Sequence, residues 1–205
     1  MASRENSVRL LIIALVVSIL AIGGTSALLY SEIADKRDNL WQVEYELMDA
    51  LGLGLVTMTN TILVTLDDSN SPQAAFNQSW MVYSGEQLVY WSAEALIAEH
   101  GVSSEESLVF DRLRHATNIV SDAFREWIEE PLRSNVTSGE SFLLSPTVKD
   151  LFTNVVTSID IIRVQAWTYE DCDHPYSRVA LSDLELVDDT ISSIVTAIEG
   201  LGSPP

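Results

Sequence analysis

Apolar residues recur at steps of three and four along nearly all of the chain after residue 30. Such spacing places them on one face of an α-helix, and a mean step near 3.5 is typical of helices packed almost antiparallel in a bundle. No segment alternates with a period of two for long enough to predict a strand. The sequence therefore predicts an all-α fold, an antiparallel bundle of four to five helices.

Five apolar stripes are expected to form the core of this bundle. The second stripe has an irregular step of five after Tyr83, whereas the fourth and fifth alternate steps of four and three throughout. The stripes are Trp41, Tyr45, Met48, Leu51, Leu55, Met58, Ile62 and Leu66; Phe76, Trp80, Tyr83, Leu88, Trp91, Ala95 and Ala98; Val109, Leu113, Ala116, Val120, Ala123 and Trp127; Val148, Phe152, Val155, Ile159, Ile162, Ala166 and Tyr169; and Ala180, Leu184, Val187, Ile191, Ile194, Ile198 and Leu201.

Turn and capping residues separate the five helices. Ser71-Pro72 and Ser145-Pro146 each combine an N-cap residue with proline at the first helical position. His100-Gly101 places glycine where a helix ends, and residues 103–106, "SSEE", predict a capping box for the third helix. We expect Pro131 to begin a longer connection before the fourth helix.

Residues 10–30 contain no charged side chain. As a helix rising about 1.5 Å per residue, this segment would cross the roughly 30 Å hydrocarbon core of a bilayer. Arg4 and Arg9 precede it, which favours a cytoplasmic N-terminus. We therefore expect a short cytoplasmic segment 1–9, a transmembrane anchor 10–30, an extracytoplasmic bundle 31–201 and a frayed tail 202–205.

A cleaved signal peptide is the competing interpretation of the same segment. Its cleavage site would lie near Ala27, after the small residues Thr25 and Ser26, and would leave a secreted domain. The apolar run continues past this point to Tyr30, which favours a retained single-pass anchor. Both interpretations place the bundle outside the cytoplasm.

The chain is strongly acidic, with a formal net charge of −19. Such a surface repels nucleic acid and anionic lipid, which excludes nucleic-acid binding as the expected function. Nine of its eleven basic residues are arginine, and this balance suits either a salt-adapted surface or an ordinary acidic exported domain. Cys172 is the only cysteine, so the chain forms no internal disulfide.

The spacing of the histidines and carboxylates in the sequence does not predict a metal centre. The Glu-x-x-His pattern of carboxylate-bridged metal bundles is absent at His100, His115 and His174. Residues 169–176, "YEDCDHPY", gather several candidate ligands, but neighbouring side chains on a turn point apart. We interpret this segment as an interhelical turn in which Asp173 or a neighbour caps the fifth helix, and we expect no metal and no cofactor.

Gly52-Leu53-Gly54 lies inside a helical stripe and lacks the third glycine and the preceding strand of a dinucleotide-binding turn. Glycine within a helix costs about 1 kcal/mol relative to alanine. We therefore expect another backbone to approach closely at this point, in preference to a bend below a ligand pocket.

Surface chemistry adds a few candidate sites. Asn77 and Asn135 begin Asn-x-Ser/Thr sequons, and Asn135 is the better glycosylation candidate because its neighbourhood is typical of a loop. Most aromatic residues fall in the expected core, but Tyr90 and Trp167 lie off the main stripes and are candidates for interaction at a helix seam or at the surface.

No catalytic motif is recognisable, and we expect the protein not to be an enzyme. The favoured function is a membrane-tethered extracytoplasmic bundle that acts as a noncatalytic ligand-binding or protein-interaction module, similar in architecture to helical sensing domains, with a protein partner in or near the membrane. The alternative is a structural surface or filament-assembly subunit with an apolar N-terminal helix. Pilins are similar in this outline, although Ser7-Val8-Arg9 does not match their processing site.

Overall fold

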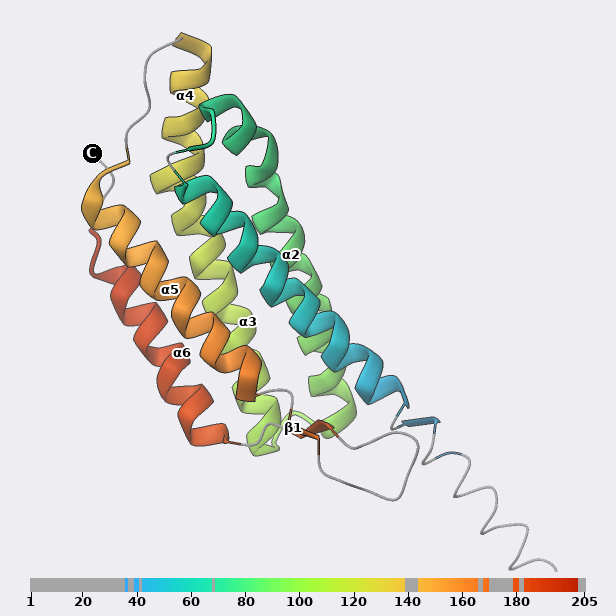
Figure 1. Cartoon of the computed structure of the whole chain (residues 1–205). Coiled ribbons are helices and arrows are strands. Elements are labelled where there is room, and N and C mark those ends of the chain that lie inside the picture. Colours follow the sequence, from blue (N-terminus) through green and yellow to red (C-terminus); the bar gives the residue numbers. More distant parts are fainter. Residues whose placement is uncertain are drawn as a thin grey trace, which may run out of the picture. The chain divides into compact units, whose positions relative to one another are not determined.

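The computed structural model describes residues 42–67, 69–138, 144–165, 168–169, 179–180 and 183–202, together with Lys36, Asn39 and Leu40 (Figure 1). Contacts within the chain separate residues Met1–Val43 from Glu44–Pro205. The expected transmembrane segment 10–30 lies outside the described residues, as does most of the turn 169–176.

The described chain is helical almost throughout, which confirms the all-α fold. Five helical segments are present, and the third is built from three successive elements. They are Gln42–Leu66; α2, Pro72–His100; α3, Glu105–Phe124, continued by the π-helix η1, Arg125–Glu129, and by α4, Glu130–Ser138; α5, Pro146–Gln165; and α6, Leu184–Glu199. Between α5 and α6, the two-residue strands β1 (Thr168–Tyr169) and β2 (Val179–Ala180) form one antiparallel ladder.

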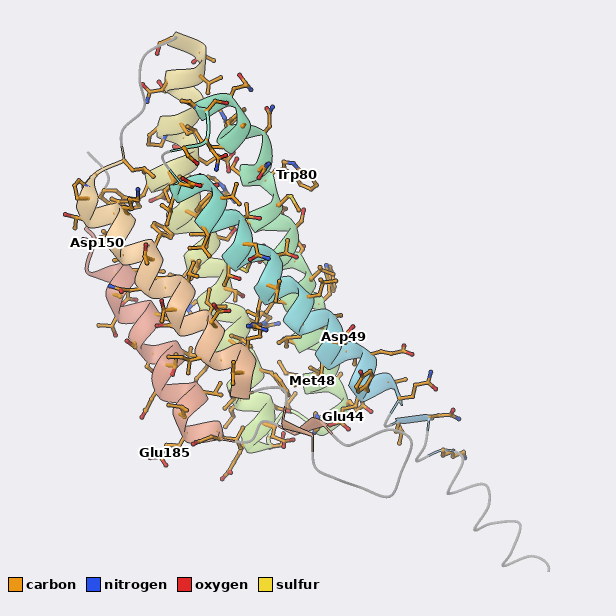
Figure 2. The ribbon with its side chains drawn as sticks, viewed as in Figure 1. Glu44, Met48, Asp49, Trp80, Asp150 and Glu185 are labelled. Carbon is orange, nitrogen blue, oxygen red and sulfur yellow. The ribbon has the colours of Figure 1, made fainter. Side chains whose placement is uncertain are left out.

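The helices pack side by side and antiparallel, as the sequence predicts. Helix α3 contacts α2 and α6, while α5 packs on α6 and α4 packs on α2. Asp150, near the start of α5, and Glu185, near the start of α6, lie at opposite ends of the bundle (Figure 2). Successive helices therefore run in opposite directions around a common core.

Four of the five predicted stripes supply that core. From Met48 to Leu66 every member of the first stripe is buried, and the third stripe is buried from Val109 to Ala123. The fourth is buried from Val148 to Ile162, and the fifth from Val187 to Ile198. The regular spacing thus identified the inward faces of these helices correctly. The fourth and fifth stripes extend too far, however, because Tyr169 lies on β1 and Ala180 on β2.

The predicted stripe on α2 is wrong, because α2 faces the core with its opposite side. Trp80 is 61% exposed and Trp91 is 65% exposed, and Trp80 projects away from the bundle (Figure 2). The inward face consists mainly of small side chains and valine. It comprises Ala75, Ser79, Val82, Gly85, Glu86, Val89, Ser92, Ala93 and Leu96.

Small residues face inward on α2 because the first helix approaches it very closely. A Cβ atom added at Gly54 would lie 2.7 Å from the carbonyl oxygen of Gly85, and one added at Gly85 would lie 2.7 Å from that of Gly54. Neither distance can accommodate a side chain. The close approach expected at Gly54 is therefore confirmed, and its partner is Gly85.

Pro131 does not begin a connection, contrary to the prediction. The helix continues through it to Ser138, and the turn immediately before it is the π-helix η1. Proline lacks an N–H, and in an α-helix its ring clashes with the carbonyl four residues earlier. In η1 the Glu130 N–H bonds to the carbonyl of Arg125, five residues back, so the wider turn accommodates the proline.

Most of the predicted helix ends are confirmed. The Ser71 side chain accepts a hydrogen bond from the Ala74 N–H, and Gly101 ends α2 with a φ of 82°. Two details differ from the prediction. At α3 the cap is Ser104, which accepts from Ser107, so no Glu completes a capping box; Asp183 rather than Asp173 caps α6, although Asp173 itself is outside the described residues.

Among the described residues, the segment Gln42–Leu66 has the length and apolar composition of a membrane-spanning helix. Half of its most apolar window is buried inside the bundle. The core helix of a soluble protein has the same length and composition, so this helix gives little evidence for a membrane crossing.

The close contact at Gly85 predicts that alanine lowers stability there more than at Gly200, where there is room for a Cβ atom. We expect Gly85→Ala to lower the free energy of unfolding by roughly 1–3 kcal/mol, because the overpacking outweighs the helix propensity that alanine gains. Gly200→Ala is the matched control, since its Cβ would meet its nearest atoms at 3.4 and 3.5 Å. Urea unfolding of both variants measures the difference, and equal stability would show that the helices can move apart at no cost.

Candidate functional site

A cleft of about 550 Å³ lies between α2 and α3. Residues one turn apart on each helix line it, because side chains three and four positions apart share a helix face. Those from α2 are Glu86, Gln87, Tyr90 and Trp91, and those from α3 are Asp111, Arg114, His115 and Asn118. The cleft is of the size that binds small molecules.

Glu86 is the most deeply buried residue of the cleft, with 2% of its surface exposed. Its carboxylate accepts one hydrogen bond, from Nε2 of Gln87 to Oε2 at 3.0 Å. None of the salt bridges within the described chain involves Glu86. A buried carboxylate is normally paired with a cation or fully hydrogen-bonded, so this one is short of donors.

The cation of the cleft, Arg114, is already engaged by other carboxylates. Its guanidinium pairs with Glu94 on α2 and with Asp111 one turn earlier on α3. The same group lies over the ring of Tyr90, 5.1 Å from the ring centroid. Arg114 is therefore held at the side of the cleft and leaves Glu86 without a counter-charge.

Two aromatic rings complete the α2 side of the cleft. Tyr90 and Trp91 meet edge to face, with ring centroids 5.3 Å apart. Tyr90 is half-buried, whereas Trp91 is exposed. Tyr90, predicted to make contacts at a helix seam or at the surface, lies in this cleft between α2 and α3, and Trp167 lies outside the described residues.

A second cleft of about 370 Å³ adjoins the other side of α3, against α6. Asp111 and His115 line both clefts, and Ser192 of α6 lines the second. These three residue types can form a nucleophilic triad, but a triad requires hydrogen bonds from base to nucleophile and to the orienting carboxylate. Within the described residues His115 makes no such bond.

The other described histidine, His100, joins three helices. Its Nε2 lies 3.2 Å from Oε1 of Glu44, at the end of the bundle where the first helix begins, and its Nδ1 lies 3.0 Å from Oε2 of Glu106 (Figure 2). His100 is thus committed to structural contacts, and the described residues contain no group of three His, Cys, Asp or Glu side chains arranged to hold a metal ion.

The structure places the two sequons on helices. Asn77 lies on the exposed surface of α2, where it accepts a hydrogen bond from Gln73. Asn135 lies on α4, is half-buried, and donates its Nδ2 to the carbonyl of Pro131. The loop expected around Asn135 is therefore wrong, and exposure ranks Asn77 above Asn135 as a glycosylation candidate.

Glu86 was not among the predicted site residues, although the sequence contains a spacing that predicts its burial. Val82, Glu86 and Val89 follow one another at steps of four and three, and this spacing continues along α2 in both directions. Because that seam contains small residues, the larger aromatic stripe gave the stronger signal for the inward face. In the correct seam Glu86 stands out as a charged residue at a core position.

The shortage of donors at Glu86 predicts that its buried carboxylate destabilises the folded protein. We expect Glu86→Gln to raise the free energy of unfolding by about 1 kcal/mol, because the amide keeps the shape of the side chain and removes a buried charge. Glu99→Gln removes an exposed charge from the same helix and is expected to change stability by less than about 0.5 kcal/mol. Chemical denaturation compares the two variants; a loss of stability in Glu86→Gln would reveal a compensating partner.

The sequence and the fold were compared with those of known proteins. The chain matches no protein-family model, no curated protein and no solved structure.

Proposed function

We propose that the protein is a noncatalytic module that binds a small molecule in the α2–α3 cleft. One observation carries this proposal: a carboxylate that is 2% exposed lines a cleft of about 550 Å³ and pairs with no cation of the described chain. Buried polar groups that lack a full set of partners lower the stability of the fold. In native proteins they are therefore expected at functional sites.

The segment 10–30 supports a location for this module. Its uncharged length and the preceding Arg4 and Arg9 favour a single-pass anchor with the bundle outside the cytoplasm. In that arrangement the α2–α3 cleft would meet extracytoplasmic solutes.

A second candidate function, docking of a protein partner, is favoured by the outer face of α2. Large apolar side chains are exposed there over three turns of helix, and exposed apolar surface of this extent is typical of interaction sites. These residues are Trp80, Met81, Tyr83, Leu88 and Trp91. Trp91 also lines the cleft, so a partner on this face would contact the ligand site directly.

Thermal unfolding of the full-length chain with three probe solutes tests the ligand-binding function. We expect at least one of n-butylamine, butyrate and glucose to raise the melting temperature in a saturable manner at constant ionic strength. Trp91→Ala should reduce the shift, whereas Trp80→Ala should keep it, because both side chains are exposed on α2 and Trp91 alone lines the cleft. No shift with any of the three would contradict the proposal.

The anchor is tested separately by the intact mass of the mature protein and by its partition between membrane and soluble fractions. We expect a full-length mass in the membrane fraction, because residues 10–30 form a continuous uncharged span. A protein that begins at Leu28 in the soluble fraction would instead identify the segment as a cleaved signal peptide.

A further inference from the structure

We propose that the ligand of the α2–α3 cleft is a protonated primary amine, whose ammonium group pairs with Glu86. This inference rests on the proposed ligand-binding function and specifies the chemical class of the ligand. It follows from the charge of the cleft, the donors that Glu86 lacks and the aromatic rings beside it.

The charge of the cleft favours a cation over an anion. Glu86 and Asp111 are acidic, and Glu94 stands beside them. Arg114 is the arginine of the cleft, and two of these carboxylates already pair with it. An anion would have to displace those carboxylates from Arg114, whereas a cation meets Glu86 without breaking any ion pair of the described chain.

The chemistry of Glu86 favours N–H donors over other cations. Gln87 donates to Oε2, so Oε1 and the remaining acceptor positions of Oε2 are available to a ligand. A primary ammonium offers three N–H donors, and a charge-assisted hydrogen bond to a buried carboxylate is about twice as strong as a neutral one. A quaternary ammonium has no N–H to donate. A divalent metal ion would require further ligands around Glu86, and no group of three candidate ligands occurs in the described residues.

The aromatic rings favour an amine that carries a short apolar chain. The guanidinium of Arg114 lies over the ring of Tyr90, so this ring already contacts a cation of the chain and Trp91 is the ring left for a ligand. Trp91 projects at the exposed rim, where its ring can cover the methylene groups of a ligand whose ammonium lies deeper. The net charge of −19 would also raise the local concentration of any organic cation near the protein.

Calorimetric titration of the full-length chain with n-butylamine near neutral pH tests this inference, with tetramethylammonium, butyrate and glucose as comparison ligands. We expect saturable binding of n-butylamine and at least tenfold weaker binding of tetramethylammonium. Glu86→Gln should weaken n-butylamine binding at least tenfold, and the matched control Glu99→Gln should alter it less than twofold. The melting temperature of Glu86→Gln, measured in parallel, shows whether the variant is folded when its binding is lost.

Exposed variants give a second test should Glu86→Gln fail to fold. Trp91→Ala should weaken n-butylamine binding, and Trp80→Ala should not. Equal affinity in Glu86→Gln and the unmodified chain, or in Trp91→Ala and Trp80→Ala, would overturn the assignment of the amine to this cleft. If butyrate or glucose binds there and n-butylamine does not, the ligand class is wrong while the binding function stands; if none binds, both proposals fail.

Discussion

The close approach of Gly54 and Gly85 is the contact on which the arrangement of this bundle depends. With 2.7 Å between each imagined Cβ and the opposite carbonyl oxygen, the first helix and α2 meet backbone to backbone. Only the small-residue face of α2 can enter such a contact, so its aromatic residues are left on the outside. The same rotation of α2 places Glu86, the residue after Gly85, at the border between the core and the α2–α3 cleft.

The sequence predicted the fold class and four of the five inward faces because, in those helices, the stripe of regularly spaced large apolar side chains coincides with the buried face. Val148, Phe152 and Val155 illustrate this on α5, where steps of four and three place them together in the core. On α2 the rule failed, because both sides of the helix are rich in apolar residues. On α2 the regular spacing of Val82, Glu86 and Val89 identifies the buried face, whereas the size of the aromatic side chains led to the wrong face.

The remaining errors come from contacts that no local pattern contains. Pro131 predicts a helix end because its ring would clash with a carbonyl of the preceding α-helical turn. The wider π-helical turn η1 removes this clash, and the helix continues. Glu106 was expected in a capping box and instead reaches His100, a residue of the preceding helix. The cleft likewise depends on how α2 and α3 pack against each other. No local sequence pattern predicts which residues of the two helices face each other there.

A buried carboxylate in a helical seam also bears on how specific the cleft can be. Position 86 lies one turn from Val82 and one turn from Val89, both fully enclosed, so the chain cannot carry Glu86 to the surface without rotating α2. The glycine contact opposes that rotation, because Gly85 adjoins Glu86 in the sequence. The carboxylate is therefore held in place before any ligand arrives, and a preorganised group loses little conformational entropy on binding. In the proposed binding function, a neutral ligand would leave this carboxylate without a counter-charge, whereas a cation would supply one. A rigid helix pair would therefore favour cationic over neutral ligands.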